Sequence, residues 1–284
     1  MSADRLHFEA LEPFGFAVEL ASAELSAAQA DALRRRYRQD GLLVVRGLSL
    51  SHPEQIALCR HFGPVHESPN ENFIVSNVEP DGLLGTRELL WHSDVPYLPE
   101  PYLGASLHAL RVDADAVGTR FASGYRACEN LPEDLRRRVD ALKALHVRER
   151  VFDRPNRLTD MIEGDMCTVH DVVRANPETG RKYLFVNQAW TALIIGLAQA
   201  DSDALHDELN RYLYDERAVY EHRWAEGDLV LWDNLAVQHA RGAAGTGVRT
   251  LQRVTIAELG YEAQYPSDMR AIYEGLHNQA LLGA

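Results

Sequence analysis

Short apolar segments broken by turn residues are the feature that most limits how this chain can fold. The stretch 42–47 is a buried-type strand closed by glycine, and 14–20 alternates as a half-buried strand does. Such segments do not alternate regularly with helices, so a parallel β/α fold is not indicated. We therefore predict a mainly β protein with flanking helices, folded as a double-stranded β-helix (jelly roll). Strands are expected at 14–20, 42–47, 102–110, 119–123, 183–186, 220–224, 228–232 and 249–257.

Four helices are expected to pack outside the sheets. Ser26 and Gln29 form a capping-box sequence that opens a helix through Tyr37, and Gly41 can end that helix. The other helices are expected at 52–62, at 131–145 with Pro132 in its first turn, and at 202–214 with Ser202 as its cap. Two long segments, 66–90 and 151–182, are polar and rich in turns. They are candidate lids, because long irregular loops in compact domains are usually functional.

The composition limits the class of protein. The 284 residues are 46% hydrophobic and no linker divides them, so a single domain over 1–284 is predicted. The net charge of −13 disfavours a nucleic-acid partner, because phosphate backbones repel an acidic surface. Three widely spaced cysteines indicate a reducing compartment. The N-terminus has no apolar signal core, and the apolar run 189–200 is shorter than the roughly 20 residues of a membrane span. We expect a cytoplasmic protein with no membrane partner.

A His-x-Asp pair and one distant histidine are the candidate metal ligands. On a strand, His92 and Asp94 would point to the same face, about 6.6 Å apart, and both could reach one ion. A third ligand must come from another strand, and His239 can supply it. Two imidazoles and one carboxylate are the ligand set of a non-haem Fe(II) centre with an open side. The pair alone is not specific, because twelve histidines give many chance spacings and a histidine on an apolar strand is commonly structural.

Two arginines follow the last candidate ligand. Arg249 and Arg253 are four residues apart, so both would face the same side of one strand, with Cα atoms about 13 Å apart. A guanidinium is a planar fork suited to a carboxylate. One arginine for each carboxylate of a short diacid is a reasonable arrangement, and a surface ion pair is the alternative for either residue.

Nine short motifs together resemble the taurine dioxygenase and 2,4-D dioxygenase family of Fe(II)/2-oxoglutarate oxygenases. They occur in the family's order and cover nearly the whole chain. The matching segments are 13–15, 41–47, 62–64, 91–94, 118–122, 176–181, 185–187, 227–234 and 249–256. The resemblance implies a jelly roll with Fe(II) held by His92, Asp94 and His239. It also implies that 2-oxoglutarate is held by Thr119, Arg249 and Arg253, with Arg253 and Thr119 at the distal carboxylate and Arg249 near the other one.

The chemistry implied by this resemblance is oxidation of a C–H bond by O2. 2-Oxoglutarate is converted to succinate and CO2 in the same cycle. Related halogenases lack the carboxylate ligand, so the presence of Asp94 favours hydroxylation, while desaturation and ring formation remain open. One departure is that the family often has Asp-Asn-Arg before the last histidine, whereas this chain has Leu235 in the third place.

A small-molecule substrate is expected, but the sequence does not identify it. Glu88 stands where taurine-specific relatives carry an asparagine, and its carboxylate would repel a sulfonate, so taurine is disfavoured. Glu88 could instead bind the ammonium of an amino acid or other amine. Tyr97, Asn187 and Trp190 are further candidates for the substrate pocket. Relatives are often dimers or tetramers, so a homo-oligomer is expected.

Two other functions remain open from the sequence. The first is a cupin-type metalloenzyme of the same fold, acting as a hydrolase or isomerase without redox chemistry. The second is a small-molecule-binding protein with a vestigial site.

Overall fold

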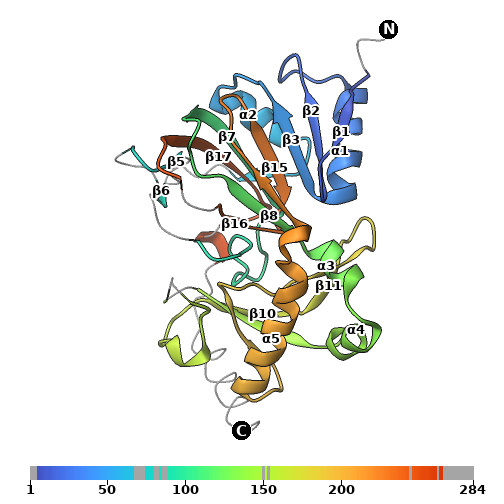
Figure 1. The fold of residues 1–284 in the computed structure, drawn as a ribbon, viewed down its shortest axis with the longest axis vertical. Coiled ribbons are helices and arrows are strands. Elements are labelled where there is room, and N and C mark those ends of the chain that lie inside the picture. Colours follow the sequence, from blue (N-terminus) through green and yellow to red (C-terminus); the bar gives the residue numbers. More distant parts are fainter. Residues whose placement is uncertain are drawn as a thin grey trace.

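The computed structural model describes residues 5–66, 74–79, 83–84, 89–148, 151, 154–242, 245–260 and 262–264. A large sheet dominates one half of the molecule, and a smaller antiparallel sheet faces it (Figure 1). The large sheet runs, in spatial order, through β1 (Phe8–Ala10), β2 (Phe16–Glu19), β3 (Leu42–Arg46), β15 (Leu229–Asp233), β7 (Gly104–Val112), β17 (Arg249–Ile256), β5 (Ile74–Ser76) and β6 (Leu83–Leu84), with β4 (Val65–His66) also on β17. The small sheet is β14 (Val219–His222), β8 (Thr119–Ser123) and β16 (Val237–Arg241). This is the architecture predicted from the sequence.

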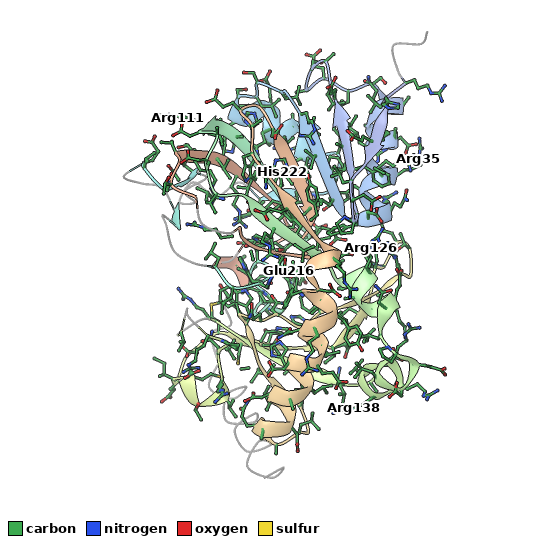
Figure 2. All side chains as sticks on the ribbon, in the orientation of Figure 1. Arg35, Arg111, Arg126, Arg138, Glu216 and His222 are labelled. Atoms are coloured by element: carbon green, nitrogen blue, oxygen red, sulfur yellow. The ribbon has the colours of Figure 1, made fainter. Side chains whose placement is uncertain are left out.

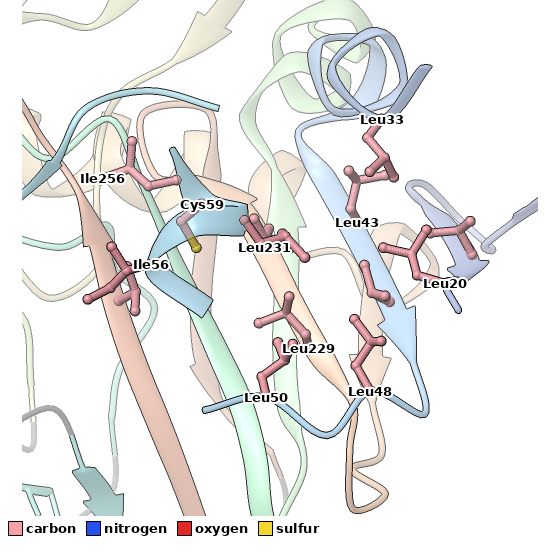
Figure 3. Close-up of a cluster of buried hydrophobic side chains, with 14 of the residues drawn as sticks. Leu20, Leu33, Leu43, Leu48, Leu50, Ile56, Cys59, Leu229, Leu231 and Ile256 are labelled. Atoms are coloured by element: carbon pink, nitrogen blue, oxygen red, sulfur yellow. The ribbon is translucent and has the colours of Figure 1, made fainter. Parts of the chain in front are cut away.

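Strand β15 is buried on both faces, because the large sheet lies between two apolar layers. Val230 and Trp232 point into the core between the two sheets, which also holds Phe121 of β8. Leu229 and Leu231 point the other way, toward the helices. Figure 3 shows this second cluster, in which the large sheet packs against α1 (Ala27–Asp40) and α2 (His52–Cys59). Because successive side chains of a strand point to opposite faces, the large sheet packs on one face against the small sheet and on the other against α1 and α2 (Figure 1).

The start and end of α1 are as predicted. The Gln29 backbone N–H donates to Ser26 Oγ, and the Gln29 side chain accepts from the Ser26 N–H. The helix continues three residues beyond Tyr37, to Asp40, and ends at Gly41. Gly41 is left-handed, with φ 73°, and a Cβ there would lie 2.9 Å from Val237 Cγ2. Glycine is therefore required both by the backbone and by the close approach of β16.

The other half of the molecule holds a second core. It is built from short sheets and helices inserted between the strands of the two main sheets (Figure 1). Its elements are α3 (Gly124–Asn130), α4 (Glu133–Val139), β9 (Lys143–Val147), β10 (Cys167–Asp171), β11 (Val173–Ala175), β12 (Lys182–Leu184), β13 (Thr191–Ile194) and α5 (Gln199–Leu213), with short 3-10 turns at η1 (Leu158–Asp160), η2 (Glu216–Ala218) and η3 (Glu262–Gln264).

Two predictions in this half were wrong. The helix expected over 131–145 ends at Val139, because 143–147 forms β9 between β10 and β13. Ala144 and Leu145 are fully buried there, so pairing with distant strands overrides the local helical spacing. The segment 151–182, expected to be irregular, contains β10 and β11.

The last helix begins earlier than predicted. Ser202 does not cap it, because its Oγ accepts the Ile194 backbone N–H at 2.7 Å and α5 already starts at Gln199. Elements α3, β13 and β16 were not among the expected helices and strands.

Most of the candidate lid 66–90 lies outside the described residues, and so does Glu88. The lid role of both segments stays a prediction, as does the single domain. Within the described ranges, no helix is both long enough and apolar enough to cross a bilayer.

Replacing Leu231 should test the role of β15. Leu231 is fully buried, so Leu231→Ala should lower the free energy of unfolding by about 2–5 kcal/mol through lost burial and a cavity. Leu110→Ala is the control, because Leu110 is 41% exposed and should cost about 0.5 kcal/mol or less. Urea unfolding of both variants measures the difference, and equal losses would contradict this description of the core.

Candidate metal centre

An isolated antiparallel bridge brings the first and last predicted ligands side by side. The His92 N–H donates to the His239 carbonyl at 3.0 Å, and the His239 N–H donates to the His92 carbonyl at 2.8 Å. His92 belongs to no longer strand, so the prediction that His92 and Asp94 share a regular strand was wrong. The chain bends instead, and Val95 has a left-handed φ of 49°. The Asp94 carboxylate nevertheless lies close to both imidazoles.

The three side chains offer donor atoms to one point. His92 Nε2 lies 4.0 Å from Asp94 Oδ1, and His239 Nε2 lies 3.9 Å from the same oxygen. One donor atom from each residue falls within 4.8 Å of the others. Two atoms that bind one ion at about 2.0–2.2 Å are at most about twice that distance apart, so the separations to Asp94 fit a shared ion. The donor set of two imidazoles and one carboxylate fits Fe(II).

The protonation of the histidines also suits a metal. The Leu90 carbonyl lies 2.7 Å from His92 Nδ1, and because a carbonyl only accepts, Nδ1 carries the hydrogen and Nε2 keeps its lone pair. Burial lowers the pKa of His92 and lowers that of His239 to about 3, so both rings are neutral at neutral pH. Burial would raise the pKa of Asp94, but the charge and hydrogen bond of Arg253, together with the two imidazoles, lower it below its ordinary value. Asp94 is therefore an anion.

Asp94 divides its two oxygens between different neighbours. Oδ1 faces the two histidines, whereas Oδ2 accepts from Arg253 Nη2 at 2.8 Å. Arg253 thus lies directly beside the metal centre, on the side of the carboxylate that does not face the imidazoles.

Two buried asparagines hold the ligand loop from behind. Asn234 Oδ1 accepts the Asp94 N–H at 2.7 Å, and its Nδ2 donates to the carbonyls of Asp94 and Tyr102 at 3.0 and 2.9 Å. Asn187 Oδ1 accepts the Ser93 N–H at 2.6 Å. Both asparagines are fully buried, so the backbone between the ligands is fixed on each side.

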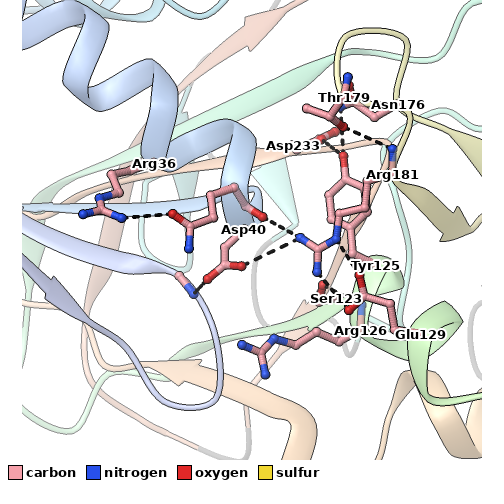
Figure 4. Close-up of polar contacts among 12 residues, drawn as sticks. Arg36, Asp40, Ser123, Tyr125, Arg126, Glu129, Asn176, Thr179, Arg181 and Asp233 are labelled. Carbon is pink, nitrogen blue, oxygen red and sulfur yellow. Dashed lines mark hydrogen bonds and ion pairs between the residues drawn. The ribbon is translucent and has the colours of Figure 1, made fainter.

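The turn that carries Asn234 is itself anchored. Asp233 Oδ1 accepts the backbone N–H groups of Leu235 and Ala236 at 3.0 and 3.3 Å, and Tyr125 donates to Asp233 Oδ2 at 3.1 Å. Figure 4 shows that this network continues from Tyr125 to Asn176 and Arg181. Burial raises the pKa of Asp233 to about 6. The network fixes the connection between β15 and β16, and therefore the register at His239.

The residues predicted for the co-substrate line one small pocket with a metal ligand. Thr119, His239, Arg249 and Arg253 all contribute to its wall. Arg249 is only 6% exposed, and its Nη1 donates to the carbonyls of Val117 and Gly118 at 3.2 and 3.4 Å. Among the described residues it has no carboxylate partner. Burial, with the charge of Arg241, lowers the pKa of Arg249 to about 10, so the group remains a cation at neutral pH.

An aromatic residue packs against one of the candidate ligands. The Trp190 ring lies 6.0 Å from the His92 ring and 5.3 Å from the Tyr97 ring, edge to face in both cases. Trp190 and Tyr97 belong to an apolar cluster that also contains Met161 and Met166. This cluster is separate from the two cores of the main sheets.

The structure therefore brings together most of the predicted site residues. The three ligands converge, and the three co-substrate residues share a pocket. Trp190 packs against His92, and Tyr97 packs against Trp190. Asn187 lies behind the ligand loop, where it binds backbone. The sequence did not predict the supporting role of Asn234, although Asn234 lies in the matching segment 227–234. Leu235, the departure from the family pattern, packs in the aromatic cluster of Tyr125, Tyr183 and Phe185, and also lines a separate hollow of about 550 Å³.

Comparison with known proteins identifies the family. The model of the taurine catabolism dioxygenase TauD, TfdA family matches residues 7–255. The chain belongs to this family. It is 32% identical over 228 residues to the (S)-phenoxypropionate/alpha-ketoglutarate-dioxygenase of Sphingobium herbicidovorans, covering 73% of this chain and 78% of the relative. It is 30% identical over 240 residues to the alpha-ketoglutarate-dependent 2,4-dichlorophenoxyacetate dioxygenase of Cupriavidus pinatubonensis, covering 76% and 83%.

Solved structures confirm the jelly-roll fold. A taurine dioxygenase from Burkholderia xenovorans superposes with a TM-score of 0.73 at 22% identity, covering 89% of this chain and 90% of that one. AAD-2, solved with Mn(II) and N-oxalylglycine, gives 0.73 at 22% identity, covering 90% and 98%. The protein is thus a 2-oxoglutarate-dependent dioxygenase that acts on a small molecule and uses Fe(II), 2-oxoglutarate and O2.

Removing the Asn234 side chain should weaken metal binding. In Asn234→Ala the Asp94 backbone loses its anchor, and Fe(II) affinity should fall by about 10- to 100-fold. Ser202→Ala is the control, because Ser202 is also buried and its side chain also accepts a backbone N–H, that of Ile194 in the second core. Calorimetric titration of Fe(II) without oxygen measures both. A similar loss of affinity in both variants would mean that general destabilisation is responsible.

Three buried histidines lie beneath the ligand loop. The Asn187 N–H donates to Thr191 Oγ1 at 2.8 Å, and Thr191 Oγ1 lies 3.3 Å from His146 Nδ1. His206 interacts with the Asn187 backbone, and the His170 ring is 5.6 Å from that of His146. Burial lowers the pKa of His170 and of His206 to about 4, and that of His146 well below its ordinary value.

These histidines should make the fold sensitive to acid. The unfolded chain takes up their protons near pH 6.5 and the folded chain does not, so stability is retained above that pH and lost as pH falls toward 4. At pH 5 each of His170 and His206 should lower the free energy of unfolding by on the order of 2 kcal/mol. His170→Gln should therefore lose less stability than the wild type between pH 7 and pH 5. Parallel pH profiles for the two proteins would rule out this contribution.

Proposed function

We propose that this enzyme hydroxylates a C–H bond of a small carboxylic acid with an apolar body, with release of succinate and CO2. The observation that carries the proposal is the position of Arg253, a cation 2.8 Å from Asp94, at a centre where the ring of the ligand His92 packs against the Trp190 ring. Two relatives named above act on phenoxypropionate and 2,4-dichlorophenoxyacetate, both apolar rings with a carboxylate. No comparison supports the cupin-type non-redox enzyme or the non-enzymatic binding protein.

We propose His92, Asp94 and His239 as the iron ligands. Bound Fe(II), with 2-oxoglutarate and O2, supplies the oxidising chemistry. The chain's own residues orient the reactants. The Nε2 atoms of the two histidines and Asp94 Oδ1 would hold the ion, and its remaining positions would be available to the co-substrate and O2. Because Asp94 is a ligand, we expect hydroxylation, with desaturation and ring formation as the alternative outcomes.

The positions of the two arginines favour a different division of roles from that expected from the sequence. Two methylene groups separate the chelating end of 2-oxoglutarate from its distal carboxylate, so the distal anchor must stand away from the ion. Arg249 bonds the carbonyls of Val117 and Gly118, directly before Thr119, and has no protein carboxylate within the described part of the chain. We therefore assign the distal carboxylate to Arg249 and Thr119, and the substrate carboxylate to Arg253.

Tyr97 and Trp190 are proposed to contact the apolar body of the substrate, with Asn187 holding the ligand loop. Taurine stays disfavoured, and an ammonium contact through Glu88 stays a hypothesis from the sequence. We also propose that the enzyme works in the cytoplasm as a homo-oligomer without nucleic-acid or membrane partners. The net charge of −13 disfavours a nucleic-acid partner, and the three cysteines, all buried and without a disulfide, fit a reducing compartment.

Succinate release should separate the substrate classes and the two arginines. Assays with Fe(II), ascorbate, O2 and 2-oxoglutarate would compare phenoxyalkanoic and alkanoic acids with matched amines and sulfonates, and the acids should be the better substrates. Arg249→Ala should raise the KM for 2-oxoglutarate, and Arg253→Ala the KM for the acid, each by at least about 30-fold, because a charged hydrogen bond is lost. Two controls address the loss of the Asp94 partner. Arg253→Lys keeps a positive charge beside Asp94, and the Fe(II) affinity of each variant shows whether the metal site is affected. A large rise in the KM for 2-oxoglutarate in Arg253→Ala alone would reverse the assignment.

A further inference from the structure

Thr119 has a buried hydrogen-bond donor behind it. Trp224 Nε1–H donates to Thr119 Oγ1 at 3.0 Å, and the two residues are 7% and 5% exposed. Trp224 follows β14, whose last residue, His222, pairs with Thr119 of β8. The strands approach closely at this end, since a Cβ on Gly118 would lie 2.7 Å from the His222 carbonyl oxygen. This approach brings the indole to the hydroxyl.

The indole is held in place by its neighbours. The His222 ring packs edge to face against it at 4.5 Å, and His222 Nε2 lies 3.1 Å from Asp228 Oδ2. In Figure 2, His222 lies inside the strand-rich half of the molecule, whereas Arg35 and Arg138 lie at its periphery. Trp224 also belongs to the core between the two sheets, with Phe121 and Trp232. Its ring therefore has little freedom to turn away from Thr119.

The direction of this hydrogen bond decides what Thr119 can offer a ligand. A hydroxyl has one hydrogen and two acceptor positions, and an indole N–H can only donate. Trp224 therefore occupies an acceptor position on Thr119 Oγ1 and leaves the hydroxyl hydrogen for another partner. Among the described residues, Trp224 is the one side chain that bonds this hydroxyl. The pocket wall that Thr119 shares with Arg249 and Arg253 is cationic, so an anionic ligand is the natural acceptor.

We propose that Trp224 is a positioning residue for the co-substrate. Its N–H fixes the Thr119 hydroxyl as a donor toward the distal carboxylate of 2-oxoglutarate, beside the guanidinium of Arg249. A hydroxyl that already accepts one hydrogen bond donates a stronger one, so Trp224 both orients and strengthens the contact. This inference rests on the proposed role of Thr119.

A double-mutant cycle between Trp224 and Thr119 tests the proposal. The dissociation constant of 2-oxoglutarate is measured by calorimetry on the oxygen-free protein loaded with Fe(II). Thr119→Val should weaken binding by about 10- to 100-fold, because a hydrogen bond to a charged group is lost. Trp224→Phe keeps most of the ring and loses the donor, and it should weaken binding by about 3- to 10-fold. In the double variant, Trp224→Phe should add no further loss to Thr119→Val.

The affinity for Fe(II) and the melting temperature of each variant are measured alongside. Trp224→His keeps a ring N–H at the position of the indole nitrogen and should recover part of the affinity, even if Trp224→Phe proves too unstable to assay. Two results would overturn the role of Trp224 and leave Thr119 as an anchor. One is unchanged 2-oxoglutarate binding in Trp224→Phe, and the other is an equally large effect of Trp224→Phe when Thr119 is already valine. Unchanged binding in Thr119→Val removes the anchor itself, and with it this inference.

Discussion

The pair of backbone hydrogen bonds between His92 and His239 is the interaction on which the centre depends. These residues are far apart in the sequence, and each lies next to elements of a different part of the fold. His239 is on β16 of the small sheet, whereas His92 lies in the sequence between β6 and β7 of the large sheet. Because the bonds are between backbone groups, they set the spacing of the two imidazoles whatever the surrounding side chains are. Asp94 completes the set from a loop whose backbone is bonded to Asn234.

Around this bridge, three polar side chains make defined contacts with the ligand loop. Asn234 binds the backbone of Asp94, Asn187 binds that of Ser93, and Arg253 takes the carboxylate oxygen that does not face the imidazoles. Buried polar groups are costly unless they are bonded, so this arrangement has few alternatives of similar energy. The ligand loop is thereby preorganised, although it belongs to no regular strand.

Much of the sheet frame could be predicted from the sequence, because its strands are short, apolar and bounded by turn residues. The segments 119–123 and 228–232 were placed almost correctly, since their strand pattern is strong and local. The strand at 143–147 could not be predicted, because its residues continue a helical spacing and become a strand only through pairing with β10 and β13. Local pattern therefore failed where the deciding contacts came from distant parts of the chain.

In the candidate site too, local sequence predicted some features, whereas contacts between distant parts of the chain decided others. The identities of His92, Asp94 and His239 could be predicted from their residue types and from the motifs around them. The contact between Arg253 and Asp94 could not be predicted, because it joins an irregular loop to β17 across a separation of 159 residues in the sequence. Asn187 was expected to face the substrate and instead supports the ligand loop, a distinction that requires coordinates.

The apolar cluster of Tyr97, Met161, Met166 and Trp190 is a small core of its own, distinct from the layers that bury β15. Substitutions in it would reshape the space next to the centre while leaving the sheets that carry His239 and both arginines untouched. A lineage with this architecture can therefore change what it oxidises in small steps without first losing the ability to oxidise. The side chains proposed to select the compound and those that hold the metal are thus packed in different clusters. This gives a physical reason why one scaffold can serve relatives that act on different compounds.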